Sequence, residues 1–123
     1  MNKIYSPTQL CGLKAQNMAR AYLQKKGYRL VKENFRTKAG EIDLIMETPN
    51  TLVFVEVRFR KSTLYASSCE SITYTKRKRI ITTASIYQQK NPTCKECRFD
   101  VIAINSHSDI DEIDWIPAAF HVE

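Results

Sequence analysis

Two carboxylates stand out in segments that are otherwise apolar and strand-like. Asp43 lies within residues 41–46, and Glu56 lies within residues 51–59. A lone carboxylate is costly to bury in an apolar strand, and two close carboxylates repel each other unless a cation lies between them. Hard divalent cations such as Mg²⁺ and Mn²⁺ prefer oxygen ligands. Asp43 and Glu56 are therefore a candidate Mg²⁺ or Mn²⁺ site, where a metal-bound water could attack a phosphodiester.

A simpler interpretation of the same residues stays open. Glu56 and Arg58 are two residues apart and share one strand face, so they could form a salt bridge that faces solvent. Asp43 could be an exposed strand residue. Leu52 and Phe54 lie on the same face as Glu56 and argue against its full exposure. Composition and spacing alone leave both interpretations standing.

A β-hairpin is the element that must bring the two carboxylates together. Residues 51–59 show the period-two alternation of a strand, and the turn signal Thr48-Pro49-Asn50 separates them from residues 41–46. Consecutive strands joined by a short turn form an antiparallel hairpin. We predict that Asp43 and Glu56 converge on one side of it, within about 4–6 Å, where charges couple strongly. The alternation places three apolar side chains on the opposite face of the first strand: Ile42, Leu44 and Met46.

The remaining pattern predicts a single α/β domain over residues 1–123. A first helix is expected over residues 7–26, where apolar residues recur at helical spacing and Gly27 supplies a left-handed stop. A basic run opens a second helix, expected over residues 72–89. The order of helix, three strands, helix and two strands predicts a mixed central β-sheet with flanking helices. The other expected segments are strands at 28–33, 98–104 and 113–116, and loops at 35–40, 60–71 and 105–112.

Composition limits the class of protein. The chain has 123 residues and a net charge of +6. A basic surface suits phosphate-rich partners, because Lys and Arg release counterions from nucleic acid. No segment approaches the roughly 18 uninterrupted apolar residues of a membrane span, and the N-terminus lacks a hydrophobic signal region. We therefore expect a soluble, cytoplasmic protein with a nucleic-acid partner and no membrane partner.

Basic residues surround the two candidate carboxylates along the sequence. Two precede the first acid, three follow the second, and four in a row open the second helix. No aromatic stacking motif of the RNA-recognition kind accompanies them, so phosphate contact without base readout is expected. A solvated cationic face is the alternative. The residues are Arg36, Lys38, Arg58, Arg60, Lys61, Lys76, Arg77, Lys78 and Arg79.

The cysteines offer a weaker signal. Cys94 and Cys97 form a Cys-x-x-Cys pair, which could be half a zinc site or a redox pair. No second pair is present, and His107 and His121 do not match a zinc-finger spacing. The pair precedes a predicted strand, whereas a redox pair usually opens a helix. We therefore interpret these cysteines as buried or idle thiols.

Several segments resemble the YraN family of small, uncharacterised bacterial proteins. The most specific are Gly40-Glu41-Ile42-Asp43-Leu44-Ile45 and, after it, Val53-Phe54-Val55-Glu56-Val57. That family in turn resembles the PD-(D/E)xK nuclease superfamily, which includes archaeal Holliday-junction resolvases. The resemblance implies a restriction endonuclease-like fold in which Asp43 and Glu56 hold the metal. It also implies action on structured or branched nucleic acid, with DNA favoured over RNA, and it raises a homodimer as an alternative to a monomer. Further matching elements are Ala19 to Tyr22, Gly27-Tyr28, Asn34-Phe35-Arg36, Lys76, Arg79-Ile80, Arg98 to Ile102 and Ala119-Phe120.

Two positions depart from the family pattern. Arg58 stands where the family usually has lysine, and Gln16 stands where it usually has glutamate. Arg58 can stabilise phosphate charge but cannot accept a proton, and Gln16 keeps an acceptor oxygen without the formal charge. Lys76, which the family shares, could approach the site but is interpreted as a helix-surface charge. The candidate catalytic set is thus Asp43, Glu56, Arg58 and Gln16.

Three classes of function remain after these observations. The first is a metal-dependent nuclease, and the second is a nuclease fold that binds nucleic acid without cutting it. The third is a protein-interaction module in which Glu56 and Arg58 form a structural ion pair. Divalent-ion binding separates the first class from the third, and cleavage that is lost on Asp43→Asn separates the first from the second.

Overall fold

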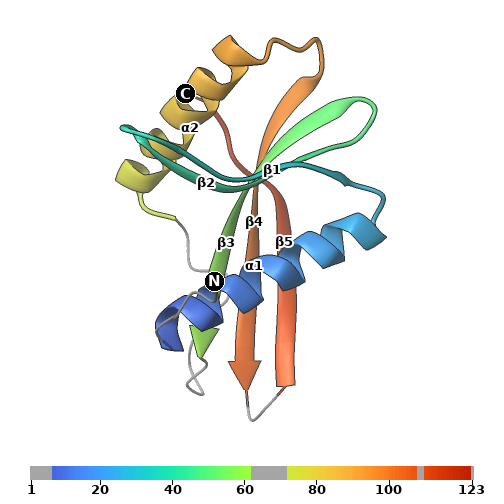
Figure 1. The fold of residues 1–123 in the computed structure, drawn as a ribbon, viewed down its shortest axis with the longest axis vertical. Coiled ribbons are helices and arrows are strands. Elements are labelled where there is room, and N and C mark those ends of the chain that lie inside the picture. The colour runs from blue at the N-terminus through green and yellow to red at the C-terminus, as the bar shows by residue number, and fades with distance from the viewer. Residues whose placement is uncertain (1–6, 62–71, 108–109, 123) are drawn as a thin grey trace, which may run out of the picture.

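A five-stranded mixed sheet forms the centre of the molecule, and two helices pack on it (Figure 1). The computed structural model describes residues 7–61, 72–107 and 110–122. The strands follow the order β1-β2-β3-β4-β5, with β3 and β4 parallel and the other neighbours antiparallel. The predicted α/β class and order of elements are confirmed. The elements are α1 (Pro7–Lys25), β1 (Arg29–Thr37), β2 (Gly40–Glu47), β3 (Thr51–Lys61), α2 (Tyr74–Lys90), β4 (Glu96–His107) and β5 (Ile110–Phe120).

The first helix ends where the sequence predicts. Ala15, Ala19 and Leu23 recur every fourth residue and are buried, which gives α1 one apolar face. Gly27 has a φ of 94°, a left-handed conformation that glycine adopts without steric penalty. The Tyr28 N–H then donates to the Leu23 carbonyl oxygen over 3.0 Å. This closure satisfies a carbonyl of the last turn and directs the chain into β1.

The predicted hairpin is also confirmed. β2 and β3 pair antiparallel, in a register that sets Glu47 opposite Leu52 and Leu44 opposite Val55. Thr48 closes the turn, because its Oγ1 accepts from the Thr51 N–H over 3.0 Å. A threonine hydroxyl that bonds nearby backbone in this way stabilises a tight turn. The turn therefore fixes the register that positions both candidate acids.

Four strands are longer than the sequence indicated; β3 continues through residues 60–61, where the start of a loop was expected. Residues 35–37 belong to β1, where a basic loop was expected, and residues 105–107 and 110–112 extend β4 and β5, where an acidic loop was expected. β1 and β5 are the two edges of the sheet. Water reaches the outer edge of an edge strand, so such a strand tolerates a polar sequence that is otherwise typical of a loop. The expectation for residues 62–71 and 108–109 lies outside the described residues.

The alternation of β2 is interrupted beside Asp43. Leu44 and Met46 pack in the apolar cluster under α1, as expected, but Ile42 packs with Ile45 in the cluster under α2. In a regular strand, residues an odd number apart lie on opposite faces. Ile42 and Ile45 are three residues apart but lie on the same face, so the strand is irregular here. The prediction that Ile42 shares a face with Leu44 was therefore wrong. On the neighbouring strand Asn34 has a φ of 51°. This irregularity in β1 lies opposite Asp43, where β2 bends away from β3.

The second helix packs closely on the start of β2. A Cβ atom added at Gly40 would lie 3.2 Å from the Arg79 Cβ and 3.2 Å from the Thr83 Oγ1. A side chain at this position would therefore crowd the helix, and glycine avoids the contact. Thr83 is fully buried, and its Oγ1 donates to the Arg79 carbonyl oxygen over 2.7 Å. Gly40 thus lets α2 reach the strand that carries Asp43.

An ion pair between Arg98 and Asp100 of β4 lies on the side of the sheet that α1 covers, and it connects β4 to neighbouring segments. Asp100 is fully buried and accepts from Arg98 Nε over 2.8 Å and from Arg98 Nη2 over 2.9 Å. It also accepts from Trp115 Nε1 over 2.9 Å and from the Ala118 N–H over 3.0 Å. Arg98 Nη2 further donates to the Tyr28 hydroxyl over 2.9 Å. Hydrogen bonding to Asp100 is the main reason that the pKa of Arg98 rises above its already high value. This network holds β4, β5 and the start of β1 together.

Candidate metal centre at the strand fork

Asp43 and Glu56 face each other at the point where β2 leaves β3. The ladder between the strands ends at the Leu44–Val55 pair, so the next opposed positions are Asp43 and Glu56. No backbone pair forms there; instead the Val57 N–H donates to Asp43 Oδ2 over 2.8 Å. The carboxylate of Asp43 therefore takes the place of a strand partner. Both side chains line the same cleft, and the charge of Glu56 acts on Asp43.

The two acids differ in their surroundings. Glu56 is 6% exposed, and Asp43 is half-buried. Burial is the largest effect on Asp43, followed by the charge of Glu56, and together they raise the pKa of Asp43 to about 7. The hydrogen bond from the Val57 N–H acts in the opposite direction, and the charge of Glu41 adds to the rise. Close carboxylates in a poorly hydrated site disfavour double ionisation, so Asp43 keeps its proton to a higher pH than a free aspartate does.

Lys76 reaches the site from the first turn of α2. Its Nζ lies 2.6 Å from Glu56 Oε1. Thr73 caps the helix, because its Oγ1 accepts from the Lys76 N–H over 3.2 Å. The cap fixes the position of the first turn, and the turn directs Lys76 to Glu56. Of the two roles considered for Lys76, approach to the site and a helix-surface charge, the structure supports the first, although about half of the side chain stays exposed.

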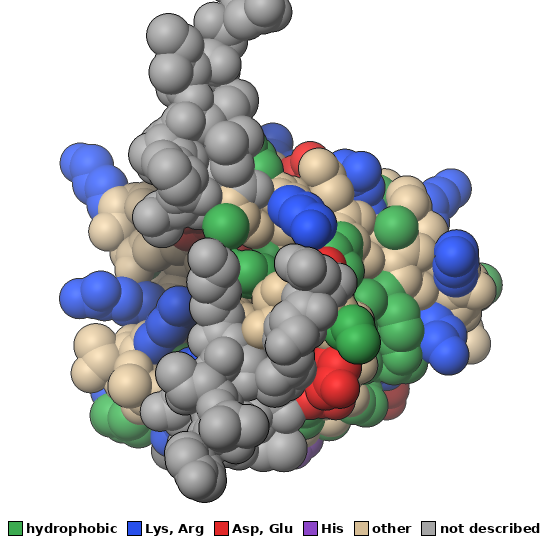
Figure 2. Space-filling view, turned by 90° about the horizontal axis from the view of Figure 1, so that it is seen from below, with side chains coloured by type: hydrophobic (Ala, Val, Ile, Leu, Met, Phe, Trp, Pro, Cys, Tyr) green, Lys and Arg blue, Asp and Glu red, His purple; other side chains and the backbone are tan. Residues whose placement is uncertain are grey.

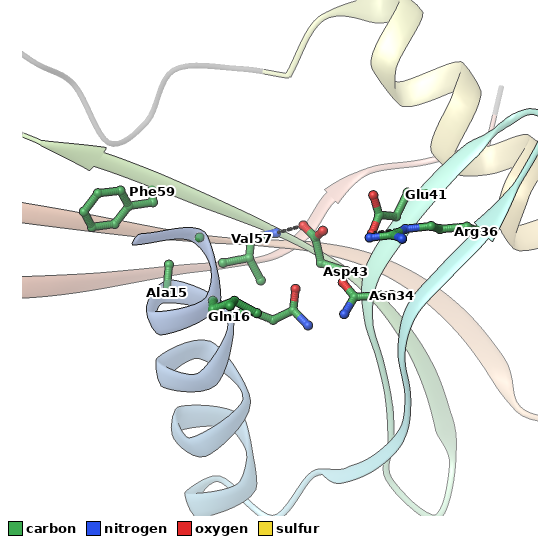
Figure 3. Close-up of a pocket in the computed structure, with 10 residues that line it drawn as sticks. Ala15, Gln16, Asn34, Arg36, Glu41, Asp43, Val57 and Phe59 are labelled. Carbon is green, nitrogen blue, oxygen red and sulfur yellow. Dashed lines mark hydrogen bonds and ion pairs between the residues drawn. The ribbon is translucent and has the colours of Figure 1, made fainter. Parts of the chain in front are cut away.

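Two clefts open onto the fork from opposite sides of the sheet. One, of about 350 Å³, lies beside α1 and is lined by Gln16, Asn34, Asp43 and Phe59 among others (Figure 3). The other, of about 470 Å³, lies beside α2 and is lined by Asp43, Glu56, Lys76 and Arg79 among others. Asp43 lines both clefts. The divergence of β2 from β3 thus exposes one carboxylate to two surfaces.

Gln16 and Arg36 both line the cleft beside α1. The Gln16 side chain extends from α1 toward Asn34 and the Asp43 side of the cleft (Figure 3). Arg36 Nε lies 3.1 Å from Glu41 Oε1, so this guanidinium is engaged by a neighbouring acid. The structure places Gln16 at the site, as its assignment to the candidate catalytic set requires, and it places Arg36 at the outer rim.

Arg58 lies on β3, two residues after Glu56. It pairs in register with Ala103 of β4 and follows Glu56 on the α2 face of β3. It is half-buried and is not among the residues that line either cleft at Asp43. Arg58 and Arg60 both have interaction partners. Lys76 contacts Glu56 of the fork directly, and the side chain of Lys61 lies outside the described residues.

The basic run that opens α2 divides between two sides of the helix. Lys76 and Arg79 line the cleft that contains Glu56, whereas Arg77 and Lys78 line another pocket. Lys38 is exposed in the turn between β1 and β2. On the face shown in Figure 2, basic side chains are spread over the surface and form no continuous stripe. The basic residues thus form several separate groups of positive charge (Figure 2).

Sequence reasoning missed two residues that shape the site. Asn34 lines the cleft beside α1 and adopts a left-handed φ of 51°, which asparagine tolerates better than most residues. Thr73 caps α2 and lines the cleft beside Lys76. A threonine three residues before Lys76 is a recognisable cap signal. The role of Asn34 carried no comparable signal, because the bend of β1 is a tertiary feature.

The cysteines lie away from the fork. Cys94 and Cys97 are free and exposed, so of the two alternatives, buried or idle thiols, the structure excludes burial. They occupy the loop-to-strand junction that the sequence predicted. Within the described ranges, no three His, Cys, Asp or Glu side chains group as a metal site. Asp43, Glu56 and Glu41 are the acidic residues among those that line the two clefts.

The fold and the fork define an α/β protein with a pair of carboxylates, of which Asp43 lines two clefts and Glu56 lines one. A model of an uncharacterised protein family, UPF0102, matches residues 15–104. The UPF0102 protein of Nitrosococcus oceani is 43% identical over 114 residues, which cover 91% of this chain and 92% of that protein. That of Coxiella burnetii is 42% identical over 122 residues, covering 98% and 99%, and that of Hahella chejuensis is 46% identical over 110 residues, covering 89% and 88%. The chain therefore belongs to the UPF0102 family, as the resemblance to YraN-like proteins predicted.

Neither described helix is both long enough and apolar enough to cross a membrane.

Proposed function

We propose that this protein is a divalent-metal-dependent, nuclease-like protein that acts on structured or branched nucleic acid. The observation that carries the proposal is the pairing of Asp43 with Glu56 at the fork, next to Lys76. Two acids and a lysine in one cleft are suited to phosphate chemistry, because they can hold a cation and neutralise a phosphate in the same place. The resemblance to the PD-(D/E)xK superfamily supports the same reading.

The donor set fits a hard divalent cation. The fork presents carboxylate oxygens from two strands. Burial and then the charge of Glu56 raise the pKa of Asp43, and a bound cation would favour its ionised form. Mg²⁺ is commonly bound by one or two carboxylates, with waters and substrate phosphates completing its shell. When bound, such an ion lowers the pKa of a coordinated water and stabilises charge on a phosphate. Mg²⁺ and Mn²⁺ are the cofactors that we propose.

The side chains around the fork have distinct proposed roles. Asp43 and Glu56 hold the cation, and Asp43 gives up its proton as the cation binds. Lys76 neutralises Glu56 in the free protein and is long enough to turn toward a phosphate in the cleft. Gln16 orients a polar group in the cleft beside α1 through its amide. Arg58 contributes positive charge further along β3 but accepts no proton.

Binding to nucleic acid is proposed to be electrostatic. Lys76 and Arg79 line one cleft of the fork, and Arg36 lines the other, while Lys38 is exposed in the turn between β1 and β2. Such contacts position a phosphate backbone without reading its sequence. We propose nucleic acid as the partner, with DNA favoured over RNA, and a homodimer as an alternative to the monomer.

A second function is favoured by two specific residues. Arg58 and Gln16 replace the lysine and glutamate that the family pattern usually has, so catalysis could be weak even if the cation binds. The alternative is therefore a catalytically weak or inactive nucleic-acid-binding protein with a nuclease fold. The two proposals share the binding surface and differ only in cleavage.

Cleavage of nucleic acid by the purified protein separates the two proposals. With Mg²⁺ or Mn²⁺, we expect slow cleavage of branched or single-stranded DNA by the parent and none by Asp43→Asn. Arg58→Lys combined with Gln16→Glu is expected to accelerate cleavage by roughly 100-fold or more if proton handling limits the rate. Residues of one site act together, so the gain in the logarithm of the cleavage rate should be larger for the double variant than the sum of the gains for the two single variants.

Asp111→Asn is the control for a lost carboxylate, since Asp111 lies in a surface pair with Lys14 away from the fork. Cleavage that persists in Asp43→Asn would come from a contaminant or another site and would overturn the proposal. Lack of cleavage by both the parent and the restored pair, on every substrate, would leave the binding protein as the function. Fast cleavage by the parent would show that Arg58 serves as well as lysine.

A further inference from the structure

A second pocket lies along α2, apart from the fork. It has a volume of about 400 Å³, and Tyr74, Arg77, Lys78 and His121 are among the residues that line it. None of its lining residues is shared with the clefts that contain Asp43. The proposed cleavage chemistry uses none of these side chains, so we consider a separate role for this pocket.

An exposed aromatic ring with two cations is the main feature of this pocket. Tyr74 is 54% exposed. The Arg77 Cζ lies 5.8 Å from the centre of its ring, and the Lys78 Nζ lies 5.0 Å from it. An aromatic face that water can reach is a platform on which a nucleobase stacks, and cations beside it match the phosphates that flank the base. A base that stacks on Tyr74 would displace one cation, which could then turn to the adjacent phosphate.

The helix geometry relates this pocket to the fork. Residues 74, 77, 78 and 81 recur at helical spacing and form one stripe of α2, whereas Lys76 and Arg79 point to the fork. The buried residues of α2, among them Ile80 and Ala84, lie between the two stripes on the side that faces the sheet. A helix with side chains is about 10–12 Å across. A strand that crosses the first turns of α2 could therefore reach both the pocket and the fork within a few nucleotides.

We propose that the pocket beside Tyr74 binds one unpaired nucleobase together with its flanking phosphates. The proposal rests on the proposed function and names the substrate class for it: nucleic acid with a single-stranded segment beside the scissile region. Bases inside a duplex already stack on one another and cannot be offered to Tyr74 without unpairing. The pocket therefore selects single-stranded or branched nucleic acid over a continuous duplex.

Equilibrium binding without cleavage tests this proposal. The probes are a single-stranded oligonucleotide with a central 2-aminopurine and a blunt duplex of the same sequence, in EDTA. We expect the parent to quench 2-aminopurine fluorescence in the single strand, because stacking on Tyr74 alters the environment of the base. Tyr74→Ala should weaken single-strand binding by about 5- to 150-fold and leave duplex binding nearly unchanged. Tyr74→Phe should restore single-strand affinity.

Salt dependence separates stacking from charge. Tyr74→Ala should leave the slope of log affinity against log salt unchanged, whereas Arg77→Ala and Lys78→Ala should each reduce it by about one if they contact a phosphate. Lys90→Ala, at the exposed far end of α2, is the charge control. Ile110→Ala, which removes a 64% exposed apolar side chain from β5, is the surface control. Both controls should bind like the parent.

The outcomes distinguish this inference from the function on which it rests. The base-binding pocket would be overturned if Tyr74→Ala lost equal affinity for the single strand and the duplex, or if it bound both like the parent. Neither result would bear on the function proposed for the fork. Absence of 2-aminopurine quenching by the parent overturns it without any variant. Absence of parental binding to both probes would overturn the nucleic-acid function as well.

Discussion

Near pH 8 and without divalent cations, Asp43→Asn is expected to be more stable than the parent, by on the order of 3 kcal/mol. The folded protein raises the pKa of Asp43 from 3.8 to about 7, through burial and then the charge of Glu56. Between about pH 4 and pH 7 the folded state therefore holds a proton that the unfolded state has lost. Since the unfolded state binds fewer protons, the parent loses stability as pH rises through this window. Asparagine keeps an acceptor for the Val57 N–H and has no charge to ionise.

Urea unfolding near pH 5 and near pH 8 measures this effect. The parent should lose stability between the two values, and Asp43→Asn should lose much less. Asp111→Asn, a surface carboxylate, should follow the parent. Equal pH dependence in the parent and Asp43→Asn would mean that Asp43 ionises freely in the folded protein. The charge conflict at the fork would then be absent, and with it the physical reason for a cation there.

Asp100→Ala is expected to destabilise the protein by about 3–5 kcal/mol. The change removes the acceptor for Arg98, for Trp115 Nε1 and for the Ala118 N–H. A buried charge that loses its partner is more costly than the pair is favourable, because the remaining group stays out of water. Arg98 is itself 27% exposed at its side chain, which limits the loss to the lower part of this range if the guanidinium can reach solvent.

Denaturant unfolding followed by tryptophan fluorescence reports this loss directly. Trp115 is the only tryptophan of the chain, and it contacts Asp100. Arg98→Met combined with Asp100→Leu should be less destabilised than the sum of the two single changes, because contacting residues couple. A stability loss below about 1 kcal/mol for Asp100→Ala, within the range of a surface change, would show that the network contributes little.

The hairpin was predictable because its pattern and its turn agree. Residues 51–59 alternate at period two, and Thr48 closes a short turn before them. Both signals are local, so neither depends on the rest of the fold. The existence of a pair of acids on neighbouring strands followed directly. The bend beside Asp43 did not, because it depends on the left-handed Asn34 of the neighbouring strand.

The edge strands were predicted poorly for a physical reason. The acidic segment before Trp115 reads as a loop, yet residues 110–120 form β5 at the edge of the sheet. Most of these side chains are exposed or half-buried. Burial therefore imposes little apolar pattern on them, and the backbone pairing with β4 decides the conformation. Pairing between segments leaves a weaker trace in sequence than burial does.

The sequence could not decide which basic side chain contacts Glu56 at the fork. Spacing alone associates Arg58 with Glu56, because the two residues share a strand face. Lys76 is 20 positions further along the chain than Glu56, yet its Nζ lies 2.6 Å from that carboxylate. The approach depends on Gly40, which admits α2 to the start of β2. A contact made through helix packing is set by tertiary structure and has no local signature.

Binding of Mn²⁺ to the purified protein tests the central claim most directly, and electron paramagnetic resonance of the free ion measures it. We predict one ion per chain near pH 8, with weaker binding near pH 6, because Asp43 must release its proton to bind the ion. Asp43→Asn and Glu56→Gln should each abolish this binding, and Asp111→Asn should retain it. Absence of binding by the parent, or binding that survives both changes at the fork, would contradict the assignment of Asp43 and Glu56 as a metal centre.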